Sequence, residues 1–398
     1  KGLNILRLRG CVQMNPDVFG VYVHIPFCVH KCNYCDFLSF PGTGDAHREY
    51  TKAVLQEIEE LDEDRRQVAS LFFGGGTPSA IDSSLIVSIV EALKKKFSFS
   101  KDAEITIECN PGTLTNEKAS DYIRCGINRI SFGLQSTDNK VLKMLGRIHT
   151  YEDFIQSLDI ARRAGFTNIS ADIMSALPGQ SVNDYTNTLN TVAELGLQHV
   201  SAYSLIVEED THLYEHLKDY PPLPDEDAER NMYHVTEDIL AGAGFHRYEI
   251  SNYAKPGYES RHNKSYWELT DYIGLGLGAS GFYKGKRYSN TSDFKTYIEG
   301  TAKGEMSFIR EVEESSVRDR IEEYMFLGLR KMEGVSYREF FKIFGQDIHS
   351  IYADVISKGI KQGLLEEYNN PAEGGVYLKL TSYGIDVSNT VMSEFIID

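Results

Sequence analysis

The sequence predicts an α/β fold, in which a partial (β/α)6 barrel is followed by a small α+β domain with a winged-helix-like outline. Six short runs that are apolar on both faces alternate with amphipathic runs of ten or more residues, which is the pattern of parallel strands joined by helices. Polar or glycine-rich residues directly follow these runs, and the carboxyl ends of parallel strands are where α/β folds carry their chemistry. Because no seventh or eighth unit is evident, we expect an open barrel with one large site at that edge.

The barrel pattern runs from about residue 20 to residue 205. Its strands are expected at 21–25, 70–73, 104–109, 129–133, 168–174 and 199–205. Helices are expected over 47–62, 83–97 and 116–125, in segments up to 164, and over 182–194 and 226–243. An irregular aromatic stretch over 245–267 then precedes a glycine run at 276–281. That run fits G-x-G-x-x-G, but no helix follows it, so we expect a turn-rich strand that closes the barrel and not a dinucleotide site.

A different composition begins near residue 311. Helices are expected near 317–332, 337–344 and 351–362, followed by a two-stranded ribbon and a last helix. Winged-helix domains often read DNA, but residues 310–398 hold ten basic and sixteen acidic side chains, so we expect a packing or partner module. The expected division is a leader or disordered N-terminus over 1–19, with Met14 as the start, a barrel over 20–310 and a C-terminal domain over 311–398.

The overall composition restricts the classes of function. The chain has 398 residues and a net charge of −17, which repels phosphate backbones and argues against nucleic-acid binding. The sequence has no apolar run of about 18 residues, so no membrane span is expected. Six cysteines are too few for a disulfide framework, and three of them lie within eight positions, which indicates a reducing cytoplasm and a metal site.

That metal site is expected in the loop after the first strand. Cys28, Cys32 and Cys35 form C-x3-C-x2-C. Three thiolates from one loop can hold three corners of an iron–sulfur cubane and leave the fourth iron without a protein ligand. A structural zinc site needs four protein ligands, and His24 or His30 would have to supply the fourth. The residues alone therefore predict a metal site and leave zinc open beside a cluster.

Several stretches of the sequence resemble radical S-adenosylmethionine (SAM) proteins, and most closely the oxygen-independent coproporphyrinogen III oxidase-like family. They are YVHIPFC (22–28), FFGGGTPS (72–79), ECNPG (108–112), RISFGLQS (129–136) and DIMSALPGQ (172–180). The resemblance implies a radical SAM barrel, a [4Fe–4S] cluster on the three cysteines and SAM bound to the open iron. It also implies that one electron from the cluster cleaves SAM to methionine and a deoxyadenosyl radical.

The same resemblance implies a set of SAM-binding residues, matched one by one to positions of this sequence. They are Tyr22, Tyr34, Gly75, Gly76, Thr77, Glu108, Gln135, Arg147, Asp172, Ile206 and Ala279. The glycines and the threonine would take the methionine part, the arginine the carboxylate, the aspartate the ribose and Tyr34 the adenine, while Ile206 and Ala279 are matched by offset alone. Each residue also has an ordinary structural reading, such as a tight turn, a helix cap or, for Arg147, a surface salt bridge.

Two features separate heme handling from porphyrinogen oxidation. The oxidases carry a fourth cysteine two residues after the third, where this chain has Phe37. The stretch His262–Trp267 reads H-N-x-x-Y-W, which resembles the group of heme chaperones within this family. A histidine in an irregular aromatic loop suits axial ligation of heme iron, while the alternative is a structural corner against the barrel. A second ligand is left open among His24, His149, His199 and His212.

The resemblance implies a cytoplasmic heme chaperone that binds a [4Fe–4S] cluster, SAM and heme. It would pass heme to an acceptor protein such as a heme-requiring enzyme of the respiratory chain, with peripheral contact to the membrane. The alternative is an enzyme of porphyrin biosynthesis that decarboxylates coproporphyrinogen III without oxygen. A third possibility is a zinc-stabilised interaction protein without radical chemistry. Whether SAM is cleaved in turnover, and the oligomeric state, are left open.

Overall fold

The structure is a computed structural model and describes residues 17–304 and 310–397. Most of the expected N-terminal leader, including Met14, lies outside the described residues. No helix in the described ranges is both long and apolar enough to cross a membrane.

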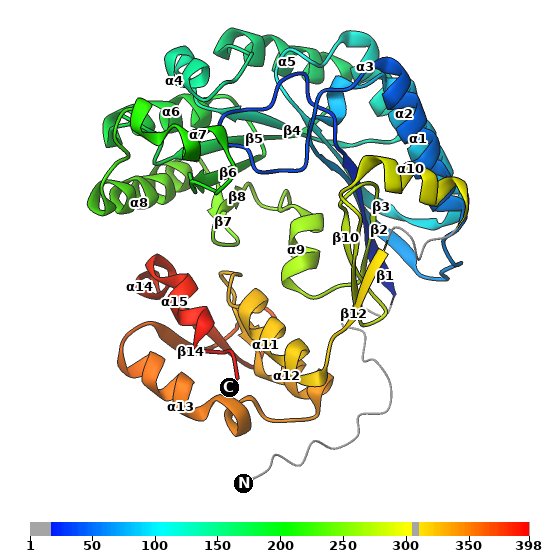
Figure 1. The fold of residues 1–398 in the computed structure, drawn as a ribbon. Coiled ribbons are helices and arrows are strands. Elements are labelled where there is room, and N and C mark those ends of the chain that lie inside the picture. The colour runs from blue at the N-terminus through cyan, green and yellow to red at the C-terminus, as the bar shows by residue number, and fades with distance from the viewer. Residues whose placement is uncertain (1–16, 305–309, 398) are drawn as a thin grey trace.

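Six parallel strands follow one another across the sheet in chain order, as the sequence predicts. They are β1 (Val18–Ile25), β2 (Gln67–Gly75), β3 (Ser98–Cys109), β4 (Arg129–Gln135), β5 (Asn168–Ser175) and β6 (His199–Ser204). The helices between them cover the outer, convex side of the sheet (Figure 1). These helices are α1 (Gly44–Glu59), α2 (Ser83–Lys96), α3 (Asn116–Cys125), α4 (Asn139–Met144), α5 (Tyr151–Ala164) and α6 (Val182–Glu194). The fold class is therefore confirmed, and α3 and α6 begin and end where they were expected.

The sheet continues beyond the barrel strands at both edges. Beside β1 it adds the parallel strand β9 (Tyr272–Leu275) and then three antiparallel strands, β10 (Ser280–Tyr283), β11 (Lys286–Asn290) and β12 (Arg310–Glu314). Beside β6 it adds the short antiparallel strands β8 (Asn252–Ala254) and β7 (His246–Arg247). The described strands end at β12 and β7 without pairing, so the barrel is open.

The glycine run at 276–281 is a turn between two strands and not the single strand that was expected. Gly276 and Gly278 have φ of 96° and 66°, which favours glycine, and these values turn the chain from β9 into β10. A Cβ atom at Gly276 would also lie 2.4 Å from the Tyr50 hydroxyl oxygen. The turn therefore packs directly against α1.

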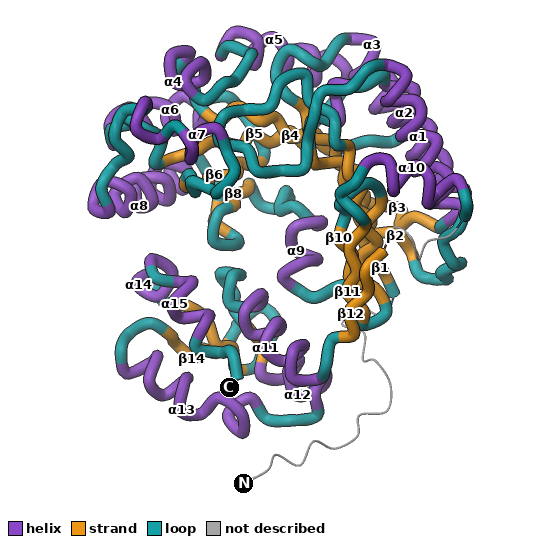
Figure 2. The backbone as a smooth tube through the Cα atoms, in the orientation of Figure 1, coloured by secondary structure: helices purple, strands orange, loops and turns teal. Residues whose placement is uncertain are grey.

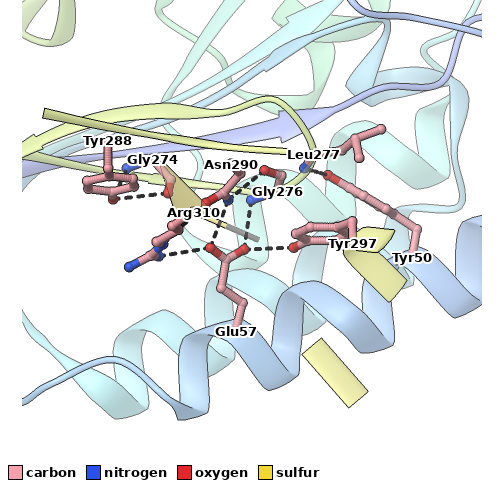
Figure 3. A network of polar contacts seen from close by, with 9 residues as sticks. All are labelled: Tyr50, Glu57, Gly274, Gly276, Leu277, Tyr288, Asn290, Tyr297 and Arg310. Atoms are coloured by element: carbon pink, nitrogen blue, oxygen red, sulfur yellow. Dashed lines mark hydrogen bonds and ion pairs between the residues drawn. The ribbon is translucent and has the colours of Figure 1, made fainter. Parts of the chain in front are cut away.

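A buried carboxylate ties this edge of the sheet to α1 (Figure 3). The Glu57 side chain is fully buried and accepts hydrogen bonds from Gly276 N at 2.9 Å, the Tyr297 hydroxyl at 2.7 Å and Asn290 Nδ2 at 2.9 Å. The Arg310 guanidinium at the start of β12 completes the set with an ion pair of 2.9 Å. Tyr297 belongs to α10 (Phe294–Ala302), so the Glu57 side chain joins two helices, two strands and the turn after β9.

The aromatic stretch that was expected to be irregular contains a helix, α9 (Arg261–Trp267). Ser260 caps it, because its side chain accepts a hydrogen bond from Asn263 N. The helix lies on the inner side of the curved sheet (Figure 2). Arg261 donates to the carbonyl and carboxylate of Asp102 on β3, which places the start of α9 at the amino-terminal part of that strand. The helix α8 (Glu226–Gly242) lies on the opposite side, against α6.

The C-terminal residues form a small α+β domain with its own apolar core, which confirms the expected outline. Its helices are α11 (Val317–Gly328), α12 (Tyr337–Phe344), α13 (Ile348–Lys361), α14 (Ser382–Asp386) and α15 (Ser388–Ser393). The ribbon has three strands, not two, in the order β13 (Val335–Ser336), β15 (Val376–Leu380) and β14 (Leu365–Asn369). The Arg330 guanidinium lies 4.5 Å from the centre of the Trp267 ring, so the last residue of the H-N-x-x-Y-W stretch contacts this domain.

Candidate cofactor site inside the barrel

The concave face of the sheet is polar, although its other face is apolar. Along β4, Ile130, Phe132 and Leu134 belong to the core beneath the covering helices. Side chains alternate along a strand, so Arg129 and Ser131 face the inside of the barrel. The same alternation places polar side chains of the neighbouring strands on this inner face, which are, from β1 to β6, Tyr22, His24, Ser70, Glu104, Thr106, Glu108, Ser170, Asp172, His199 and Ser201.

Two carboxylates of this face, Glu108 and Asp172, hold protons more tightly than usual. Burial, together with the nearby Asp172 carboxylate, raises the pKa of Glu108 to about 8. Burial also raises the pKa of Asp172, and the Ser201 and Ser131 hydroxyls oppose that shift. Ser131 Oγ lies 3.2 Å from Asp172 Oδ1. A pair of desolvated carboxylates suits a ligand that brings positive charge or hydroxyl groups.

We expect Glu108 to make the stability of the protein without added ligands depend on pH. Its folded-state pKa of about 8 lies above the ordinary value of 4.5, so the folded protein binds the extra proton between these pH values. The free energy of unfolding should therefore fall as the pH rises from 5 to about 8. Chemical denaturation at several pH values measures this slope. Glu108→Gln should flatten it and the exposed control Glu117→Gln should not; an unchanged slope in Glu108→Gln would contradict the assignment.

The three cysteines lie on the loop that follows β1 and are free thiols, each half-buried. Hydrogen bonds to the end of α4 and to the segment after β6 hold this cysteine loop in place. Asn33 N donates to Leu145 O at 3.0 Å, Asn33 Nδ2 donates to Met144 O at 3.0 Å, and Leu213 N donates to Asn33 O at 2.7 Å. The loop is thereby fixed to the segments after β4 and β6, over the carboxyl ends of the strands. Leu213 belongs to the short helix α7 (His212–Glu215).

A chain of polar contacts links two of the cysteines. Cys28 Sγ lies 3.3 Å from Thr77 Oγ1, which accepts a hydrogen bond of 2.8 Å from Asn110 Nδ2. Arg147 Nη2 donates to Asn110 Oδ1 at 2.8 Å and to the carbonyl of Gly133, while Arg147 Nη1 lies 3.5 Å from Cys32 Sγ. Arg147 therefore lies inside the site and does not form the surface salt bridge that was the structural alternative for it. Asn110 was missed as a functional candidate, although it is the first polar residue after β3.

The donor set of this loop fits an iron–sulfur cluster better than a single metal ion. Three free thiols share one loop, with a guanidinium beside Cys32 and a hydroxyl beside Cys28 that can stabilise thiolate charge. Within residues 17–304 and 310–397, no three His, Cys, Asp or Glu side chains converge on a position for one ion. His24, one expected zinc ligand, has both ring nitrogens in hydrogen bonds, to the Tyr22 hydroxyl at 3.0 Å and to Leu38 O at 2.9 Å.

The glycine segment after β2 lies against the cysteine loop. Gly76 N donates to Ile25 O at 2.9 Å and Thr77 N donates to Phe27 O at 2.8 Å. A Cβ atom on Gly76 would lie 2.8 Å from Phe27 O, so this close approach requires glycine there. The expected SAM-site positions around Gly75, Gly76 and Thr77 therefore lie beside the cysteines.

The remaining expected SAM residues differ in their accessibility. Gln135 ends β4 with an unusual φ of 67°. Ile206 lies after β6 and is 68% exposed, at the outer edge of the opening. Ala279 is buried in the β9–β10 turn, where its carbonyl accepts a hydrogen bond from Asn290 N at 2.9 Å. Burial raises the pKa of Tyr34, and the nearby Arg147 guanidinium opposes the shift.

His262, the expected heme ligand, is buried on α9 and offers no free ring nitrogen in this arrangement. Its Nδ1 lies 2.9 Å from Ser70 Oγ, and its Nε2 lies 2.8 Å from the Tyr266 hydroxyl oxygen. The ring also stacks on Phe72 with a centroid distance of 5.1 Å. Burial, and then the Arg129 charge, lower its pKa to about 3, so the ring is neutral. To reach an iron, it would have to leave both hydrogen-bond partners.

The other histidines that were left open as a second heme ligand differ in their burial and in the hydrogen bonds of their ring nitrogens. His199 is fully buried, with Nδ1 2.8 Å from Ser170 Oγ and Nε2 2.8 Å from the Tyr248 hydroxyl oxygen. His149 is buried, and its Nε2 lies 3.4 Å from Leu134 O. His212 is exposed on α7, with Nδ1 3.3 Å from the Tyr220 hydroxyl oxygen.

Comparison with known proteins shows the family of the chain. Residues 22–192 match the Radical SAM superfamily, and residues 316–370 match the HemN C-terminal domain. The chain is 36% identical over 381 residues to a protein of Bacillus subtilis (strain 168) named "Heme chaperone HemW", covering 95% of this chain and 99% of the relative. A protein of the same name from Escherichia coli (strain K12) is 32% identical over 385 residues, covering 95% of this chain and 98% of the relative.

Among solved structures, coproporphyrinogen III oxidase (HemN) from Escherichia coli superposes with a TM-score of 0.81 over 96% of this chain and 91% of the oxidase, at 22% identity. At that identity the likeness supports the fold and not the activity. The sequence matches above 30% identity extend over both the barrel and the C-terminal domain. The chain therefore belongs to the HemW family of radical SAM proteins.

Proposed function

We propose that this protein is a heme chaperone that binds a [4Fe–4S] cluster, SAM and heme, and passes heme to an acceptor protein. The observation that carries the proposal is the match to relatives named heme chaperones over nearly the whole chain. Phe37 supports it, because this side chain occupies the position at which the oxidases carry a further cysteine. The acceptor would be a heme-requiring enzyme of the respiratory chain, reached from the cytoplasm at the membrane surface.

In this proposal Cys28, Cys32 and Cys35 hold the cluster, which when bound supplies an electron to SAM. Arg147 keeps its positive charge beside Cys32, although burial opposes it, because the Tyr34 hydroxyl and the cysteine thiols raise its pKa. Its guanidinium would therefore stabilise both the thiolates and the carboxylate of SAM. Glu108 and Asp172 would receive the amino and hydroxyl groups of SAM deeper in the barrel.

Heme would approach through an apolar border around the opening. Val29, Phe37, Ile148 and Ile206 are each exposed by 63–68%. The first two lie on the cysteine loop, the third follows α4 and the fourth follows β6, so three loops at the carboxyl ends of the strands contribute to this border. Val29 and Ile148 also line a hollow beside Cys32 and Arg147. Exposed apolar side chains around an opening suit the porphyrin face.

The proposal is tested by two assays on protein reconstituted anaerobically with iron and sulfide. The protein should bind heme near stoichiometrically and should convert no coproporphyrinogen III, even with SAM and a reductant present. Absorbance titration measures the first and chromatography of the porphyrins measures the second. Formation of protoporphyrinogen would overturn the chaperone proposal in favour of the oxidase, and the absence of heme binding would overturn it as well.

Replacing His262 by alanine tests what the H-N-x-x-Y-W stretch does. We expect His262→Ala to lower the free energy of unfolding by about 2–4 kcal/mol, because a buried stacked ring and two hydrogen bonds are lost. The absorption spectrum of the bound heme should stay unchanged, since the ring has no free nitrogen. The exposed control His216→Ala should change neither quantity. A shifted heme spectrum in His262→Ala alone would show instead that α9 rearranges to supply an axial ligand.

A further inference from the structure

Inside the barrel, a buried arginine side chain forms no ion pair within the described residues, and its Nε has no hydrogen-bond partner. Arg129 begins β4, faces the concave side and is only 2% exposed. A guanidinium carries five donors and stays charged, so burying it without an acceptor is unfavourable. A group from outside the chain is therefore expected to meet it.

A second unpartnered donor lies beside it on the neighbouring strand. Thr106 of β3 is aligned with Arg129 in the parallel register, and both side chains face inward. The Thr106 hydroxyl is fully buried and has no hydrogen-bond partner. Native proteins leave few buried polar groups unsatisfied, and two adjacent ones on the inner face indicate a missing acceptor.

The charges around Arg129 leave its positive charge uncompensated at close range. The groups that it influences are Glu108, Asp172, His199, His262 and Tyr248. Arg129 opposes the raised pKa values of the two carboxylates, and within the described residues neither of them forms an ion pair with it. The two histidines are neutral, because burial lowers their pKa values. An anionic group would restore the balance.

We propose that Arg129 and Thr106 form a receptor for a carboxylate that enters the barrel, and that a propionate of the bound porphyrin is this carboxylate. A planar guanidinium can donate two parallel hydrogen bonds to one carboxylate, and the threonine hydroxyl can donate a third. The SAM carboxylate is the other possible source, but Arg147, whose Nε has no hydrogen-bond partner, lies beside Cys32 and would receive it there. The choice of propionate rests on the proposed heme binding, whereas the receptor itself does not.

The first test needs no variant. Cluster-loaded protein is titrated with hemin and with hemin dimethyl ester, in which both propionates are blocked. Hydrogen bonds to a charged group predict that hemin binds about tenfold or more tightly than the ester. Equal affinities would remove propionate as the bound group.

The second test separates the two carboxylate sources. Arg129→Met should weaken hemin binding to the level of the ester and leave the affinity for the ester unchanged, while Arg129→Lys should retain part of the preference. SAM affinity, measured in parallel by equilibrium dialysis, should be unchanged in both variants. If Arg129→Met weakens SAM binding and leaves the ratio of hemin to ester unchanged, the receptor stands and SAM supplies its carboxylate.

Two further outcomes distinguish failure of the carboxylate receptor from failure of the proposed heme function. If hemin and the ester bind equally to the wild type, and Arg129→Met leaves SAM binding unchanged, the receptor proposal is overturned and Arg129 is a structural charge. If the wild type binds neither porphyrin, the proposed heme function fails and the propionate with it, while the SAM measurement still decides whether Arg129 receives a carboxylate. Thr106→Val, which keeps the shape of the side chain, should cause a smaller loss in the same direction.

Discussion

Replacing any one of Cys28, Cys32 and Cys35 by alanine should abolish cluster assembly. In the proposed site these three thiolates would be the whole protein ligand set, so a single loss would leave two irons of the cluster without a protein ligand. After anaerobic reconstitution, the variants should lack both the bound iron and the broad visible absorption that the wild type acquires. Iron and sulfide analysis with absorption spectroscopy measures this, and the expected effect is complete loss.

Two other cysteines provide matched controls for that experiment. Cys109 is buried at the end of β3 and does not belong to the loop that carries the other three cysteines. Cys125 ends α3 and lies near the Tyr122 carbonyl, at 3.2 Å. Cys109→Ala and Cys125→Ala should therefore keep the full cluster content. Loss of iron in either one would mean that the ligand set is wrong.

Removing the Glu57 carboxylate should cause the largest loss of stability among the substitutions considered. Glu57→Ala removes the carboxylate that pairs with the Arg310 guanidinium and accepts hydrogen bonds from Asn290 and the Tyr297 hydroxyl (Figure 3). Breaking one side of a buried ion pair costs about 3–5 kcal/mol, because the remaining charge is uncompensated. Chemical denaturation measures this cost.

The exposed neighbour Glu59 on the same helix is the control. Glu59→Ala should change the free energy of unfolding by no more than about 0.5 kcal/mol, as is usual for a surface position. A loss in Glu57→Ala as small as that of the control would show that the network contributes little to stability.

The central strands and helices could be predicted from the sequence, because each has a local pattern. Strands β1 to β6 contain short apolar stretches, although their inner face is polar and not apolar as the sequence predicts, and α3 and α6 are amphipathic helices with side-chain caps at Thr115 and Ser181. The edge strands were missed for the opposite reason. Strands β7 and β13 have two residues each and exist only through their pairing partners, β8 and β15. A two-residue strand leaves no periodicity to detect.

The sequence predicts which residue types form the candidate site, but it does not predict which of them contact one another. The cysteine spacing identifies a metal loop, whereas the contacts from Thr77 through Asn110 to Arg147 join segments 33 and 37 residues apart. His262 shows the same limit. A sequence displays an imidazole near aromatic residues but cannot show that Ser70, almost 200 residues away, occupies one of its nitrogens. Arg129 likewise looks like an ordinary charged residue until its burial is known.

The position of α9 has a consequence for the timing of binding. The helix covers the inner side of the barrel near the amino ends of β2 and β3, through the contacts of His262 with Ser70 and of Arg261 with Asp102. The opposite end, where the cysteine loop lies, is then the route for both arrival and departure. A molecule seated beside Arg129 would leave only after the molecule seated nearer the cysteines had left. The outer ligand would thus determine the residence time of the inner one. Binding would be ordered, with the inner ligand binding first and dissociating last.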